Sequence, residues 1–100
     1  MRVIISDLAD RDLEEIGDYI AADNPDRARS FVRELRARCE ALSETPRAYP
    51  LREEFGGDVR LLVHRRYLIL YRVLADIVYV ERVWHGARKV IPLLGPPDES

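Results

Sequence analysis

YLILYRVL (residues 67–74) and IVYVERVW (residues 77–84) are two runs of strand-forming residues with only Ala75-Asp76 between them. A connection of two residues leaves room only for a tight turn, although these two lack the Asn-Gly or Asp-Gly that such turns prefer. The sequence therefore predicts an antiparallel hairpin. Its second strand leads directly into His85-Gly86-Ala87-Arg88, so we expect the working chemistry of the chain at this strand end.

The hairpin has a third strand before it. Residues 59–64 predict one strand, and Arg65-Arg66 marks a tight connection to residue 67. In residues 67–74 both alternating faces are largely apolar, which is typical of a central strand whose second face is partly covered or used. These three strands predict an antiparallel meander.

The first half of the chain predicts a short strand and two helices. Residues 3–5 are apolar and long enough for one strand, and Ser6 then precedes a helical pattern as an N-cap. Asn24-Pro25 supplies the cap and first-turn chemistry of a second helix. The fold class is thus α+β: an N-terminal strand and an α-helical hairpin packed on a small antiparallel sheet, in the order β-α-α-β-β-β. The inner faces of the two helices are Ala9, Leu13, Ile16, Tyr19 and Ile20, then Ala28, Phe31, Val32, Leu35, Cys39 and Leu42.

Length and composition indicate one domain over residues 1–100, with a flexible tail at 92–100. The longest uncharged apolar run has five residues, against about 20 for a membrane span, and we expect a cytoplasmic protein without a leader. Cys39 is the only cysteine and is interpreted as a core residue. With two histidines in the chain, we expect no metal site and no cofactor.

Charge is unevenly distributed. Residues 1–50 carry 8 Arg and 11 Asp or Glu, a balance of −3, whereas residues 59–91 carry seven basic and two acidic residues, a balance of +5. Because opposite charges attract a partner, the region around the predicted sheet is the part suited to an acidic polypeptide or a phosphate. The alternative is a general preference for Arg, since 15 of the 16 basic residues are Arg.

Several short motifs occur together in a fixed order. They are Ser6-x-x-Ala9-x-x-Asp12-Leu13-x-x-Ile16-x-x-Tyr19-Ile20, Asn24-Pro25-x-x-Ala28-x-x-Phe31, Thr45-Pro46, Tyr67-x-Ile69-x-Tyr71-Arg72-Val73 and Arg82-Val83-x-His85-Gly86-x-Arg88. The set resembles the RelE/ParE superfamily of bacterial toxins over about residues 3 to 89. The resemblance implies the RelE/ParE-like fold and a toxin of a type II toxin–antitoxin system. It also implies a ParD-like antitoxin of the ribbon-helix-helix class, through which alone the toxin would meet operator DNA.

The superfamily contains two kinds of activity. RelE-like members cut messenger RNA on the ribosome, a reaction that needs a base, cations and an acid; the candidates here are Arg60, Arg65, Arg82 and His85. ParE-like members inhibit DNA gyrase without catalysis. There is no Lys before residue 89, and after it no titratable side chain until Asp98, so the ParE-like reading, with no catalytic residue, is favoured. A member that has lost toxicity and only binds its antitoxin is a third possibility.

The candidate partner-binding residues are Arg72, Arg82, Trp84, His85 and Arg88. Each has a structural alternative. His85 would hydrogen-bond at the strand end and orient Gly86, which we expect in a backbone conformation closed to other residues. Trp84 would pack in the core or at an edge, and Arg72 would either pair with an acid from the helices or face outward. An apolar groove rimmed by Arg, between the helical hairpin and the sheet edge, is the expected seat of the antitoxin.

Overall fold

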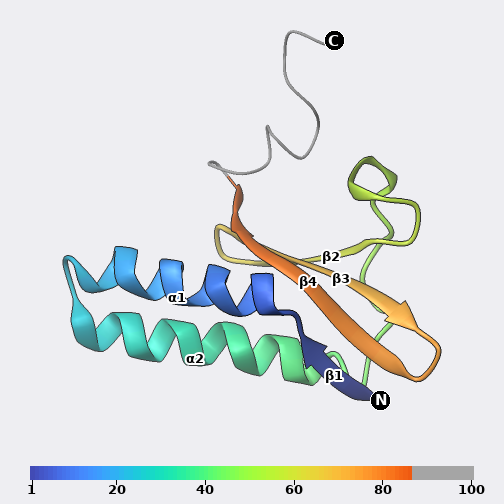
Figure 1. Ribbon diagram of the computed structural model, residues 1–100, viewed down its shortest axis with the longest axis horizontal. Coiled ribbons are helices and arrows are strands. Elements are labelled where there is room, and N and C mark those ends of the chain that lie inside the picture. The colour runs from blue at the N-terminus through green and yellow to red at the C-terminus, as the bar shows by residue number, and fades with distance from the viewer. Residues whose placement is uncertain (87–100) are drawn as a thin grey trace, which may run out of the picture.

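The computed structural model describes residues 1–86, which form a helical hairpin packed against a four-stranded sheet (Figure 1). The α+β order of the elements is the predicted one. The predicted flexible tail at 92–100 and the candidate Arg88 lie outside the described residues. The elements are β1 (Arg2–Ile5), α1 (Asp7–Ala21), α2 (Pro25–Ala41), the short 3₁₀ helix η1 (Glu53–Phe55), β2 (Arg60–His64), β3 (Tyr67–Leu74) and β4 (Ile77–His85).

The strands lie in the order β1-β4-β3-β2. β3 is a central strand and pairs antiparallel with both β2 and β4, which confirms the predicted meander. β1 pairs in parallel with residues 77–80 of β4 and adds a fourth strand to the meander, so the whole sheet is mixed. The paired residues of β1 and β4 are more than 70 positions apart in the sequence. A pairing over this distance leaves no local signal in the sequence.

The two helices begin where their caps predict. The Oγ of Ser6 accepts a hydrogen bond of 2.9 Å from the amide of Ala9, and the Oδ1 of Asn24 accepts one of 3.0 Å from Arg27. Pro25 stands in the first turn of α2, where its missing N–H costs nothing. These caps satisfy amides that a helix start leaves unpaired.

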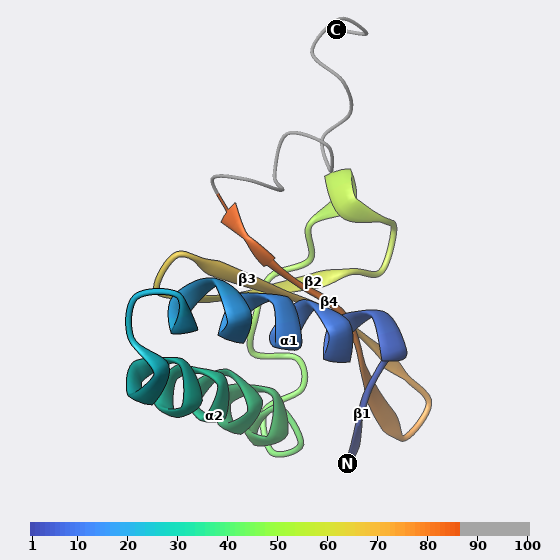
Figure 2. The same cartoon turned by 60° about the vertical axis from the view of Figure 1, so that its left-hand side comes forward.

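The main core lies between the helices and one face of the sheet (Figure 2). Cys39 is fully buried in it, as predicted, and burial raises the pKa of its thiol to about 12. Tyr19 was predicted to lie on the inner face of the first helix, and this prediction is wrong, because Tyr19 is 63% exposed. The last turns of α1 extend past the sheet in Figure 1, so the helical spacing continues after the surface it covers has ended.

A smaller apolar cluster covers the opposite face of the sheet. Val59, Leu61 and Leu70 are buried there, with Phe55 of the loop after α2 packed on them. Leu70 belongs to this cluster and Tyr71 to the main core, because adjacent residues of a strand point to opposite faces and both faces are covered. The β3–β4 pairing shifts register between these two residues. The shift sets one extra residue, at position 81, into β4, as a β-bulge does.

The positive backbone φ angles fall at turns and in the loop. Arg65 (57°) and Ala75 (51°) each open a two-residue hairpin turn, and Gly56 (142°) follows η1. Gly86 is not among them, so the conformation predicted for it is wrong. Its amide instead donates a hydrogen bond of 2.8 Å to the carbonyl of Arg66, which extends the β3–β4 ladder by ordinary pairing.

Candidate partner-binding site

The second half of β4 is an open strand edge that α1 closes. β1 reaches only residue 80 of β4. Beyond it the amide of Ser6 donates to the carbonyl of Val80 at 3.0 Å, and the Ser6 hydroxyl donates to the carbonyl of Glu81 at 2.8 Å. The amide of Val83 donates to Oδ2 of Asp12 at 3.0 Å. Polar groups at the start of α1 therefore replace the missing strand.

Asp12 also holds Arg82 through both carboxylate oxygens. The Nε of Arg82 donates to Oδ2 at 2.8 Å, and one of its terminal nitrogens donates to Oδ1 at 2.9 Å. The side chain of Asp12 is 6% exposed and that of Arg82 is 30% exposed. Hydrogen bonding to Asp12 raises the pKa of Arg82. Because a bidentate pair fixes the fork of the guanidinium, Arg82 is committed to holding α1 on β4.

Trp84 lies on the face of the sheet away from the helices. It packs against the Val59, Leu61 and Leu70 cluster, and the guanidinium carbon of Arg82 stands 4.7 Å from the centre of its ring. These contacts agree with a packing role. Its Nε1 is buried without a hydrogen-bond partner among the described residues, so the indole N–H remains an unused donor.

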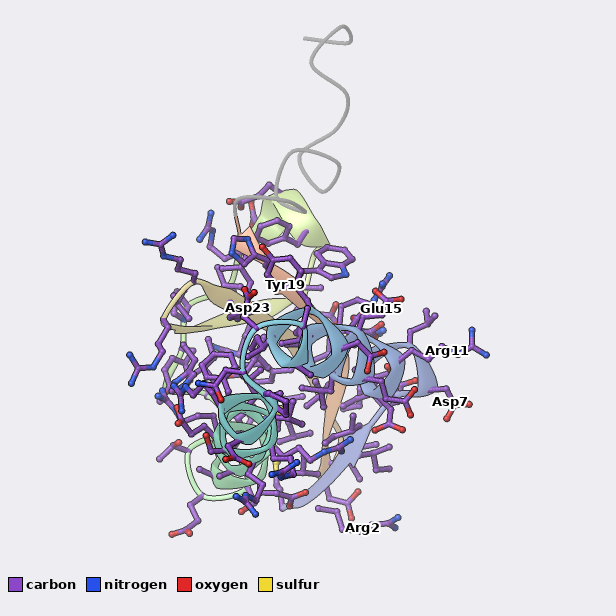
Figure 3. The ribbon with its side chains drawn as sticks, turned by 90° about the vertical axis from the view of Figure 1, so that its left-hand side faces the viewer. Arg2, Asp7, Arg11, Glu15, Tyr19 and Asp23 are labelled. Carbon is purple, nitrogen blue, oxygen red and sulfur yellow. The ribbon has the colours of Figure 1, made fainter. Side chains whose placement is uncertain are left out.

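His85 stands at the end of β4 beside a small hollow. Its ring meets the ring of Tyr67 edge-on, with 5.0 Å between the centroids, and its buried Nδ1 has no hydrogen-bond partner within the described part of the chain. The hollow has a volume of about 110 Å³ and is lined from α1 by Glu15 and Tyr19. Figure 3 shows these two side chains on α1, one turn apart.

Arg72 faces outward and forms ion pairs with one residue of β4 and one residue of the loop before β2. It donates to Glu81 at 2.8 Å and to Asp58 at 3.2 Å, and these bonds raise its pKa, Glu81 foremost. Neither partner comes from the helices, so the outward alternative is the one observed. Arg72, Arg82 and Trp84 line one hollow of about 350 Å³ on this face.

The four residues named for RNA cleavage are not brought together. Arg60 donates to the carbonyl of Tyr49 at 2.7 Å, which ties down the loop after α2. Arg65 sits in the β2–β3 turn, 3.8 Å from Glu34. Arg60 pairs across the sheet with Tyr71, away from the β4 end. The β2–β3 turn lies nearer to that end, because the amide of Gly86 donates to the carbonyl of Arg66 at 2.8 Å.

Asp12 contributes to this site but was not among the residues predicted for it from the sequence. A usable signal was present, because position 12 falls between Ala9 and Leu13 in the buried stripe of the helix. A carboxylate there needs a partner.

Within residues 1–86 no three His, Cys, Asp or Glu side chains gather as a metal site would require. None of the helices described has the length and apolar character that crossing a bilayer demands.

A larger groove lies between the two helices. This interhelical groove has a volume of about 490 Å³, and Gly17, Ala21, Ala28 and Val32 are among the residues that line it. A methyl group added at Gly17 would stand 3.3 Å from Val32, so the helices approach closely here. Apolar space rimmed by Arg was predicted between the hairpin and the sheet edge; the structure places the wider space between the helices.

Comparison with known proteins gives a family and related solved structures. The family model described as ParE toxin of type II toxin–antitoxin system, parDE, matches residues 3–90. The solved structure "Chromosomal ParDE TA system from P. aeruginosa" is similar with a TM-score of 0.74 and 22% identity, covering 85% of this chain and 95% of that one. At this identity the likeness concerns the fold. No curated protein matches the chain.

Proposed function

The chain belongs to the family of ParE toxins of type II toxin–antitoxin systems, and we propose that it arrests growth by binding DNA gyrase until a cognate antitoxin neutralises it. The family match over residues 3–90 carries this proposal. It agrees with the ParE-like reading that the sequence favoured.

The geometry supports binding in preference to catalysis. Metal-independent RNA cleavage needs a base, an acid and free cations around one phosphate. Arg82, the cation three residues before His85, is bound by both carboxylate oxygens of Asp12. Arg60 and Arg65 stand on the β2 side of the sheet. We therefore assign the β4 end and the face bearing Trp84 to contact with a protein target.

A ribosome-dependent endoribonuclease is the second candidate. The observation in its favour is the Nδ1 of His85, which has no partner in residues 1–86 and borders an open hollow. An imidazole ring can serve as a general acid or base. This candidate requires a target that supplies the missing catalytic groups.

The proposed antitoxin is a ParD-like protein with a ribbon-helix-helix DNA-binding part. The similar solved structure, which is of a ParDE system, supports the pairing. We expect the C-terminal part of the antitoxin to be disordered alone and to fold across the toxin on apolar anchors and charged side chains. The interhelical groove offers both kinds of contact. An antitoxin truncated before this part should no longer bind the toxin in a binding titration; undiminished affinity would disprove the assignment.

The proposed site of action is the cytoplasm, where gyrase works on the chromosome.

Growth phenotype tests the proposed function in cells. Expression of the chain without its antitoxin should stop division with filamentation and a DNA-damage response, because trapped gyrase breaks DNA. Rapid arrest of protein synthesis with cut messengers, before DNA damage, would favour the endoribonuclease. Normal growth with intact antitoxin binding would indicate a member that has lost toxicity.

A further inference from the structure

The interhelical groove has walls of opposite charge. Glu14 and Asp18 form the α1 wall, and Arg29, Arg33 and Arg36 form the α2 wall. The floor is apolar and shallow because the helices meet through Gly17 and Val32. The charge difference follows from the sequence, since α1 carries six carboxylates and one Arg, whereas α2 carries five Arg and three carboxylates.

Three of these wall charges are unsatisfied within the described chain. Arg29 pairs with Asp26, and Arg36 pairs with Asp10 at 2.6 Å. Glu14, Asp18 and Arg33 take part in none of the hydrogen bonds or ion pairs found among residues 1–86, and all three are exposed. Charges left open beside an apolar floor are available to a partner that presents the opposite pattern.

A second copy of the groove presents that pattern. A two-fold axis that runs along the groove, between two copies placed face to face, exchanges the two walls. Such a rotation keeps every residue at its own level along the groove, and the Gly17–Val32 contact marks one level that both helices share. The carboxylate wall of one copy then lies over the arginine wall of the other along the whole groove.

We propose that the interhelical groove is a self-association surface, in which a second copy of this chain packs groove against groove in a two-fold dimer. Glu14 of each copy then pairs with Arg33 or Arg36 of the other, and Asp18 pairs with Arg33 or Arg29, because the two helices run antiparallel from the Gly17–Val32 level. The close approach of small residues on the floor lets the two hairpins stack as a four-helix layer.

The expected dimer is weak. A helix of 15 residues is about 22 Å long and about 10 Å wide, so the two hairpin faces cover roughly 900 Å² together. This is below the usual size of a stable interface, about 1,600 Å², and predicts a dissociation constant in the micromolar range. The opposed charges make the affinity fall with salt.

This inference rests partly on the proposed function, because it adds a regulatory state to the free toxin. A toxin that is dimerised through the groove hides the same apolar surface that we offer to the antitoxin. Accumulated free toxin would then be protected from nonspecific association, and the antitoxin would compete with the second copy.

Analytical ultracentrifugation of the full chain, separated from its antitoxin, tests the dimer directly. Between about 1 and 100 μM the mass should rise from one chain towards two, and about 1 M NaCl should return it to one. E14R and R33E should each raise the dissociation constant at least about tenfold, because each introduces like-charge pairs at both symmetric positions. E14R/R33E combined should bind more tightly than either single variant, because the new Arg and the new Glu can pair between the two copies.

Matched controls are R11E on α1 and E40R on α2, both exposed and outside the groove, which should leave the mass unchanged. Circular dichroism confirms that each variant is folded. A single-chain mass at the highest concentration, or a double variant no better than either single one, overturns the proposal. If the chain is monomeric while E14R or R33E loses antitoxin binding, the groove belongs to the antitoxin alone. Gyrase inhibition by the same samples is scored separately, so a monomer that inhibits gyrase refutes only the dimer.

Discussion

Both carboxylate oxygens of Asp12 on α1 accept hydrogen bonds from Arg82 on β4, at 2.8 and 2.9 Å, and one of them also accepts a hydrogen bond from the amide of Val83. Seventy residues of sequence separate the two side chains, and the contact fixes α1 along the strand edge that β1 leaves open. Arg82, which the sequence offered as a cation for phosphate chemistry, therefore has a structural role. What remains exposed near the β4 end is a surface suited to contact with another protein.

The Asp12 contact predicts a large stability cost for a small change. Asp12→Ala removes three acceptor contacts and leaves the Val83 amide unpaired, so urea unfolding should show a loss of about 2 kcal/mol. Asp12→Asn keeps an acceptor for Val83 and should lose about half as much. Asp23→Ala, at an exposed carboxylate beyond α1, is the control and should change little. A loss below about 0.5 kcal/mol in Asp12→Ala would show that the pair holds nothing together.

His85→Gln should leave toxicity nearly unchanged. The described structure shows His85 packing edge-on against Tyr67, a contact worth about 1 kcal/mol, and an amide preserves hydrogen-bonding ability while it removes acid–base chemistry. Growth arrest on induction is the measurement, with thermal melting and antitoxin binding as checks on the fold. Complete loss of toxicity in a variant that passes both checks would require a catalytic histidine.

Arg88→Gln should weaken toxicity without unfolding the domain. Arg88 lies outside the described residues, so the prediction rests on its place in the Arg82–Arg88 motif and on the basic balance of residues 59–91. Surface substitutions usually shift stability by about 0.5 kcal/mol or less. The induction level needed for growth arrest should rise, while the melting temperature stays constant. Arg47→Gln, an exposed change in the loop after α2, serves for comparison; equal effects of the two would remove the case for Arg88.

Cys39 should be inert in the folded protein. Its thiol is fully buried and its pKa is raised to about 12, so at a pH of about 8 only about one part in 10⁴ is thiolate. A disulfide reagent such as DTNB should label the native chain only at the rate of unfolding and label it at once in concentrated guanidinium chloride. Fast labelling of the native chain would contradict this burial.

The sequence predicted those parts of the fold that depend on neighbouring residues. The caps at Ser6 and Asn24, the two helices and the meander all follow from short-range patterns, and the structure confirms them. The parallel pairing of β1 depends on contacts between strands more than 70 residues apart, and the shift between Leu70 and Tyr71 depends on an extra residue inside β4. No local periodicity encodes these.

The site was predicted less completely than the fold. Arg72 and Trp84 fall on one face, as candidates for partner contact should, but whether they touch a partner stays a prediction. Arg82 was chosen for its charge and its motif, and neither reveals that Asp12 neutralises it. Charge patterns in a sequence count the cations; only the packing of α1 on β4 shows which of them are already paired.

Supercoiling of relaxed plasmid by purified DNA gyrase, with and without the chain, is the most direct measurement of the central claim. The chain should inhibit supercoiling at stoichiometric concentrations, equimolar antitoxin should abolish the inhibition, and a parallel translation reaction should contain uncut messenger. Undisturbed supercoiling by a folded, antitoxin-binding chain, together with messenger cut on the ribosome, would contradict the account.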